Sequence, residues 1–282
     1  MSCLYCGARV RKFTFDKQVQ PVLRRLLEES ALSYFEKKEV FNRKNGYCIN
    51  CGLQQSTNIP NLHLLKILYA TFSQADVSEA LSGDFPSPLA LDNFSKNVFK
   101  RRIDLFNQFN LQHQFSPRHV AMMRYQDGSI LEYFGEQFNS TLWGWEPVQS
   151  LRNHCDHQLA IKQLPIDFHG RFVYTGNASE NLPKFDLLIC FHSLLHSAIP
   201  RDDLLFLKGL CRTGSLIIFM DEIMIKRRNP FHMTHPKEEH FSRFLASNFP
   251  RIMRVANAGN PEKHIVDHSF NGDNPDYWCW VE

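Results

Sequence analysis

The sequence lacks the long apolar segments that a membrane protein needs. No run of about 18 uncharged apolar residues occurs in its 282 residues. The first residues, Met1 to Leu4, also lack the apolar core of a signal peptide. We therefore expect a soluble, cytoplasmic protein with no membrane partner. General disorder is excluded, because 43% hydrophobic residues are enough to build a buried core.

The sequence also has little net charge. Its 32 basic residues face 29 acidic ones, and the formal net charge is +3. The excess lies in residues 1–60, which hold ten Lys and Arg against five Asp and Glu. A balance this close to neutral disfavours nucleic acid as the main partner. It says nothing about the oligomeric state.

Eight cysteines are too few for a disulfide-rich protein of this length, so their spacing carries more information than their number. Two CxxCG motifs, Cys3 to Gly7 and Cys48 to Gly52, supply four thiolates on two short loops, which suits a tetrahedral zinc ion. Neither motif begins a helix after a strand, which disfavours a thioredoxin-like redox role. The sequence therefore predicts a zinc-binding domain over residues 1–60 with a structural zinc ion. Its ligands would be Cys3, Cys6, Cys48 and Cys51.

The rest of the chain divides into a helical segment and an α/β domain. Residues 61–115 contain two helical patterns, 62–72 and 92–109, the second with Asp92 as its expected N-cap, and we interpret them as a linker or lid. Over residues 116–282, short apolar runs alternate with helical stretches, which predicts βαβ units and a Rossmann-like sheet with helices on both faces. The runs are 119–125, 141–146, 171–175, 185–191 and 215–220, followed by a strand pair at 252–256 and 277–281.

Polar residues follow these runs, where a Rossmann-like sheet binds its ligand. Glu146 ends the second run, 18 residues beyond Gly128, and a carboxylate at that place holds a ribose diol in such folds. Taken singly, each of these residues is typical of a turn or a solvated strand end. Their order and spacing favour a cofactor site. The candidate cofactor-binding residues are Arg124, Asp127, Gly128, Glu146, Pro147, Asn177, Ala178 and Phe191.

The run from Phe185 to His196, followed by 204–210 and 215–219, resembles the fourth strand, helix and fifth strand of class I S-adenosylmethionine-dependent methyltransferases. The likeness covers about residues 118–282. The two CxxCG motifs, with Tyr47 to Leu53, are similar to the zinc domain of bacterial C-methyltransferases that act on nucleotide-linked deoxysugars. The resemblance implies an enzyme that transfers the methyl group of S-adenosylmethionine to a small, nucleotide-activated, sugar-like substrate.

The resemblance also implies roles for single residues. Arg124 to Gly128 falls on the Gly-Ser-Asn-Asp-Gly cofactor loop of the family, and Lys237 to His240 falls on its Tyr-Asp-Glu-His element. His240 is therefore the candidate base, with His192 and His196 as rivals, because an imidazole takes up a proton near neutral pH. Asp127 and Gly128 would shape the cofactor loop, and Asn177 and Ala178 would lie near the adenine. Arg124 replaces the first glycine, where a side chain is expected to crowd the methionine part of the cofactor.

Two other functions fit parts of the sequence. A degenerate methyltransferase fold, serving as a binding or assembly module, is favoured by Arg124. An RNA-modifying protein would use the basic zinc domain to bind phosphates. A second metal site at His232, His235 and His240 is disfavoured, because their spacing fits no standard ligand pattern.

Overall fold

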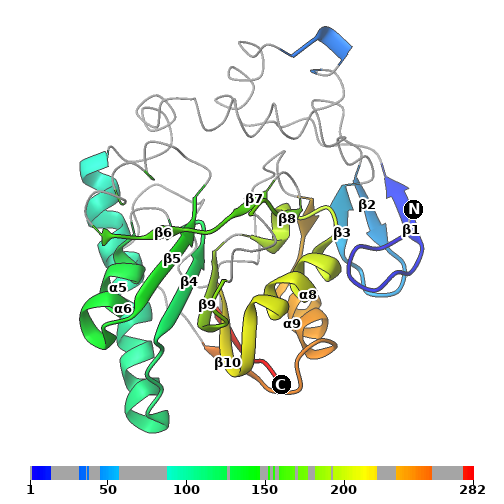
Figure 1. Ribbon diagram of the computed structural model, residues 1–282. Helices are drawn as coiled ribbons and strands as arrows, with labels where there is room; N and C mark the ends of the chain where they lie inside the picture. Colours follow the sequence, from blue (N-terminus) through cyan, green and yellow to red (C-terminus); the bar gives the residue numbers. More distant parts are fainter. Residues whose placement is uncertain are drawn as a thin grey trace.

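A mostly parallel sheet of seven strands forms the centre of the computed structural model (Figure 1). Its order is β12-β13-β10-β9-β4-β5-β6, and β13 is antiparallel to both of its neighbours. The strands are β4 (His119–Met123), β5 (Thr141–Trp145), β6 (Lys162–Gln163), β9 (Phe185–Phe191), β10 (Cys211–Met220), β12 (Ile252–Val255) and β13 (Asp276–Trp280). The chain runs outward from β4 to β6 and then returns to β9 on the other side of β4. This reversal between β4 and β9 is a topological switch point, where open α/β sheets bind ligands.

The structure describes most, but not all, of the chain. The described residues are 2–13, 32–35, 37, 45–56, 88–125, 128–146, 152, 155, 159–168, 171–176, 182–191, 193–220, 233–255 and 276–282, with the backbone alone at 88–99, 101 and 235. The helix expected over residues 62–72 lies outside them. No helix in this described part is long and apolar enough to span a bilayer.

Helices cover both faces of the sheet. One face packs against α5 (Pro88–His113) and α6 (Ser129–Phe138), and the other against α8 (Pro200–Leu210) and α9 (Glu238–Ala246). The strands between them are apolar on both sides, and β9 is buried at all of its residues. The predicted α/β class, with a Rossmann-like sheet between two helical layers, is confirmed.

One predicted strand is not in this sheet. Residues 171–175 contain β8 (Phe172–Tyr174), which pairs with β7 (Ile166–Phe168) as a separate antiparallel hairpin. The edge of the main sheet is β6, whose Lys and Gln are both exposed. An exposed, polar edge strand has no apolar run to reveal it, so the prediction chose the neighbouring apolar run instead.

Helix α5 begins earlier than predicted. It starts at Pro88, so Asp92 lies inside the helix and the prediction of an N-cap there is wrong. Proline is favourable in a first helical turn, because the N–H that it lacks would have no intrahelical partner there. The final strand pair is confirmed by β12 and β13, which pair antiparallel.

The cysteine motifs belong to a second, smaller sheet, of order β1-β2-β3-β11. Its strands are β1 (Val10–Phe13), β2 (Asn45–Cys48), β3 (Gln54–Ser56) and β11 (Thr234–His235). Strand β11 comes from the segment just before α9, so the small sheet is completed by residues far along the chain. It lies beside α8 and α9 (Figure 1), and the Tyr5 ring stacks on Phe244 of α9 with 4.2 Å between the ring centroids.

Candidate functional site

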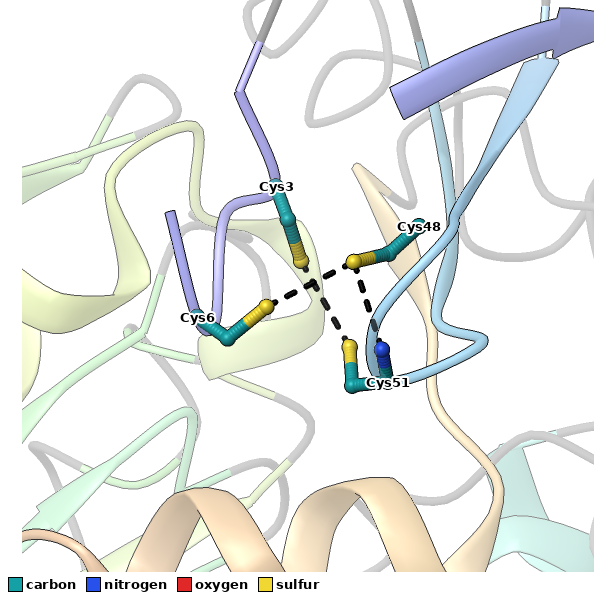
Figure 2. Close-up of side chains that lie close together, drawn as sticks. All are labelled: Cys3, Cys6, Cys48 and Cys51. Atoms are coloured by element: carbon teal, nitrogen blue, oxygen red, sulfur yellow. Dashed lines mark hydrogen bonds between the residues drawn. The ribbon is translucent and has the colours of Figure 1, made fainter. Parts of the chain in front are cut away.

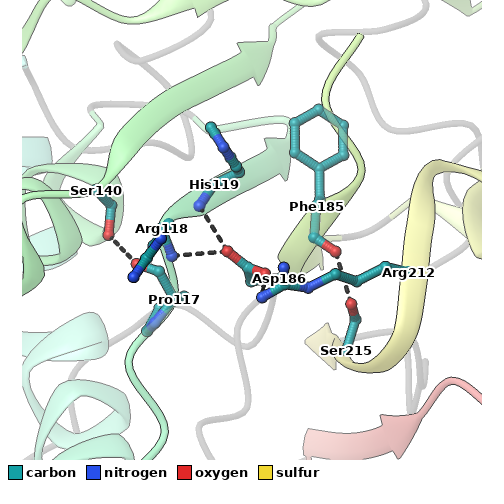
Figure 3. A network of polar contacts seen from close by, with 8 residues as sticks. All are labelled: Pro117, Arg118, His119, Ser140, Phe185, Asp186, Arg212 and Ser215. Carbon is teal, nitrogen blue, oxygen red and sulfur yellow. Dashed lines mark hydrogen bonds and ion pairs between the residues drawn. The ribbon is translucent and has the colours of Figure 1, made fainter.

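The amino ends of β4, β9 and β10 are held in register by a buried carboxylate. Asp186, at the start of β9, accepts hydrogen bonds from the backbone N–H groups of Arg118 at 2.7 Å and His119 at 2.9 Å (Figure 3). It also forms an ion pair with Arg212, at the start of β10. The Ser215 hydroxyl donates a hydrogen bond to the Phe185 carbonyl, at 2.7 Å. Because these contacts fix the amino ends of the three strands, their carboxyl ends lie side by side at the opposite end of the sheet.

At the carboxyl edge, Arg124 follows β4 with an unusual backbone. Its φ is 61°, in the left-handed region that glycine adopts readily and other residues rarely. Its N–H donates to the Trp145 carbonyl, at 2.6 Å. The side chain reaches η1 (Leu194–His196), the short 3₁₀ helix after β9, and its Nη1 lies 3.0 Å from His196 Nε2. Since a guanidinium only donates, His196 accepts through Nε2 and is neutral in this contact.

Two more predicted residues lie at the same edge. Glu146 follows β5 and is only 2% exposed, so its carboxylate lies inside the protein surface. Phe191 is the last residue of β9, and its buried side chain packs in the apolar cluster under α5 and α6. The structure thus brings Arg124, Glu146 and the end of β9 to the edge where the prediction placed the cofactor. Asp127, Pro147, Asn177, Ala178 and His192 lie outside the described residues.

Gly128 stands at the start of α6 with a φ of 76°. A Cβ there would lie 2.5 Å from Leu159 Cδ1 and 3.3 Å from Cys155 Sγ. Both the backbone and the packing of these side chains therefore require glycine. This is a structural reason for Gly128, in addition to the loop-shaping role that the sequence predicts.

His240 lies against the second cysteine motif. It is in the first turn of α9, where its Nδ1 accepts from the N–H of Lys237 at 3.2 Å. Its Nε2 is 3.3 Å from Glu239 Oε1, and a Cβ added to Gly52 would be 3.3 Å from the same nitrogen. Burial lowers the pKa of His240, although Glu239 opposes this. The imidazole is therefore neutral at pH 7 and carries its proton on Nε2, because Nδ1 is the acceptor.

The four predicted metal ligands converge (Figure 2). The Sγ atoms of Cys3, Cys6, Cys48 and Cys51 all lie within 4.8 Å of one another. The pairs Cys3–Cys51 and Cys6–Cys48 are 3.7 and 3.4 Å apart. Zn–S bonds of about 2.3 Å in a tetrahedron place sulfurs about 3.8 Å apart, so the cluster has the size of a zinc site. The N–H groups of Asn50 and Cys51 point at Cys48 Sγ, at 3.3 and 3.4 Å, as in a knuckle.

The thiols differ in acidity. Burial raises the pKa of Cys3 to about 11 and raises that of Cys51 further. For Cys6 a smaller burial effect is outweighed by hydrogen bonds from the Ala8 backbone, Cys48 and Asn50, and its pKa falls to about 7. Binding of a metal ion would release the protons of the buried thiols, because the thiolate is the ligand.

No family model matches the chain, and no curated protein does so either. Solved structures that resemble it include magnesium protoporphyrin IX methyltransferase (ChlM) from Synechocystis PCC 6803 with bound S-adenosylmethionine, at 12% identity and a TM-score of 0.49, covering 80% of this chain and 100% of the other. The amino pentose methyltransferase CalS10 from Micromonospora echinaspora has 11% identity and a TM-score of 0.46, and the match covers 69% of this chain and 95% of the other. The plantazolicin methyltransferase BpumL has 14% identity and a TM-score of 0.44, and the match covers 78% of this chain and 98% of the other. Similarity this low does not assign an activity.

Proposed function

We propose that the chain is an S-adenosylmethionine-dependent methyltransferase with a structural zinc ion. The observation that carries this proposal is the position of Arg124 and Glu146 at the carboxyl ends of β4 and β5, beside the switch point between β4 and β9. The sheet order supports it, because an antiparallel last strand inserted between the fifth and the sixth strand, as β13 is here between β10 and β12, is typical of the class I methyltransferase fold.

In this proposal Glu146 accepts hydrogen bonds from the two ribose hydroxyls of the cofactor, a geometry that a carboxylate suits. The cofactor supplies an activated methyl group, and the protein positions the acceptor in line with it. Asp127, Gly128, Pro147, Asn177, Ala178 and Phe191 are the further proposed contacts. His240 and His192 remain the proposed bases, and the contact of His240 Nδ1 with Lys237 would have to open if that nitrogen were to take a proton.

For the acceptor, we infer a small molecule of the nucleotide-linked sugar class. The support is the residue pattern alone: the CxxCG motifs are similar to those of sugar C-methyltransferases, and Lys237 to His240 falls on their Tyr-Asp-Glu-His element, with Lys237 in place of the tyrosine. Methyl transfer to a panel of nucleotide-linked sugars, compared with the free sugars, tests this inference. Methylation of the free sugars alone would contradict it.

The cofactor proposal is tested by calorimetric titration with S-adenosylhomocysteine. The Glu146→Gln variant should bind at least about tenfold more weakly, because it loses a charged acceptor for two hydroxyls. Glu136, exposed on α6, provides the matched control, and Glu136→Gln should bind as the unchanged protein does. Absence of heat at millimolar ligand in the unchanged protein would favour the degenerate binding module instead.

A further inference from the structure

Arg124 keeps a conformation that a long side chain disfavours. Its φ of 61° lies in the left-handed region, so the arginine adopts the backbone of the glycine that it replaces in the family's loop. The turn is fixed on both sides: the Arg124 N–H donates a hydrogen bond to the Trp145 carbonyl, and the side chain of the next residue, Tyr125, is fully buried. Backbone strain of this kind is found in turns, as at Asn139 after α6, and it also clusters at functional sites, where the surrounding structure enforces it.

The guanidinium reaches from the end of β4 to η1, which follows the neighbouring strand β9. Its partner His196 is buried on η1. Helix η1 is itself anchored, because the Met233 N–H donates to the Leu195 carbonyl at 2.8 Å and the Ser193 hydroxyl donates to the Phe191 carbonyl at 3.1 Å. An arginine is always charged and His196 is neutral in this contact, so the pair carries a positive charge at the switch point.

We propose that Arg124 binds the carboxylate of the amino-acid part of the cofactor, and that His196 is the positioning residue that orients the guanidinium. This inference rests on the proposed function and adds to it. Where a glycine lets the cofactor approach the backbone, this chain uses a charge-assisted fork, which matches a carboxylate in geometry. The arginine then selects the cofactor instead of crowding it.

The test compares two ligands that differ in the group concerned. S-adenosylhomocysteine has the carboxylate, and 5′-methylthioadenosine keeps the adenosine and thioether but lacks the amino-acid part. Arg124→Gln should lower the affinity for S-adenosylhomocysteine at least about tenfold and leave the affinity for 5′-methylthioadenosine nearly unchanged, because only the first ligand can form the charged hydrogen bonds. Arg118, exposed at the opposite end of β4, is the control for the lost charge, and Arg118→Gln should change neither affinity.

Three further variants separate positioning and binding from crowding. Arg124→Gly fits the backbone without strain, so it should fold and should still lose affinity for S-adenosylhomocysteine; tighter binding would mean that the arginine crowds the site, and would overturn the inference. His196→Ala should lower the preference for S-adenosylhomocysteine over methylthioadenosine, and His196→Gln, which retains an acceptor, should restore it. An unaltered preference in Arg124→Gln overturns this inference alone. Failure of the unchanged protein to bind either ligand overturns the proposed function as well.

Discussion

At the scale of the residue, Asp203 is the clearest case of a group whose surroundings change its chemistry. It lies in the first turn of α8, is 1% exposed, and accepts a hydrogen bond from the Phe172 N–H at 2.9 Å, which joins α8 to β8. Burial raises its pKa to about 6, although hydrogen bonds from Ser197 and Phe172 oppose this. The folded protein therefore takes up this proton at a higher pH than the unfolded chain does.

This shift predicts how stability depends on pH. Because the folded pKa is raised from 3.8 to about 6, protonation stabilises the folded state as the pH falls through 6, and the gain is complete below 3.8. It amounts to about 3 kcal/mol. In Asp203→Asn, which keeps the acceptor for Phe172, this gain should be absent. Urea unfolding between pH 4 and 7 measures the difference, with Asp202→Asn, exposed in the same turn, as control. Parallel pH profiles for Asp203→Asn and the unchanged protein would contradict this assignment.

The sequence predicts single residues well where their chemistry is local. The four cysteines converge because two short chelating loops allow few other arrangements. The contact between Arg124 and His196 could not be predicted, because it joins residues 72 positions apart through the ends of two parallel strands. Its one sequence signal is that each residue follows an apolar run. Likewise, no local pattern shows that His240 lies against Gly52.

At the scale of the element, β4, β5 and β6 are joined by one aromatic side chain. Tyr125, two residues after the end of β4, lies over Gly144 of β5, and its hydroxyl accepts a hydrogen bond from Gln163 of β6 at 3.0 Å. A Cβ on Gly144 would be 2.3 Å from Tyr125 Cδ1 and 3.1 Å from Ile161 Cγ2. The strands can pack this way only because position 144 has no side chain.

Gly144→Ala should therefore destabilise the protein by about 1–3 kcal/mol, since the fully buried tyrosine has no room to move aside. Gly209→Ala is the matched control. Gly209 is exposed in α8 with nothing within 4 Å of an added Cβ, so alanine there should stabilise the helix by up to about 1 kcal/mol. Thermal melting of both variants gives the comparison. Equal melting temperatures for Gly144→Ala and the unchanged protein would show that the ring can move.

Elements with two buried faces are the ones that the sequence predicts. The runs at β4, β5, β9 and β10 are apolar because helices cover both sides of them, and all four lie where predicted. At the sheet edge this signal fails. Strand β6 is held by pairing with Trp143 and Gly144, not by its own apolar residues, and the hairpin strand β8 has the stronger apolar pattern. Edge strands depend on their neighbours, and a single sequence does not show which neighbours those are.

At the scale of the whole molecule, the small sheet that carries the cysteine motifs is joined to the α/β domain by a continuous path of backbone hydrogen bonds. From β3, the Ser56 N–H donates to the Met233 carbonyl at 2.9 Å, and the Met233 N–H donates to Leu195 in η1 at 2.8 Å. Helix η1 carries His196, the partner of Arg124. The proposed metal site and the proposed cofactor site are thus connected through β3, Met233, which directly precedes β11, and η1.

Removal of the metal should therefore affect more than the N-terminal sheet. A chelator should lower the melting temperature and increase amide hydrogen exchange at Met233 and Leu195 as well as at β2 and β3, because the sheet would lose the proposed zinc ion that joins its two loops. The purified protein should contain about one zinc per chain. Cys51→Ser should lack zinc, and the chelator should not change its melting temperature or its amide exchange further. Cys211→Ser, outside the cluster, should keep its zinc. Exchange that rises in β2 and β3 alone would show that the hydrogen bonds through Met233 do not transmit the loss of the metal.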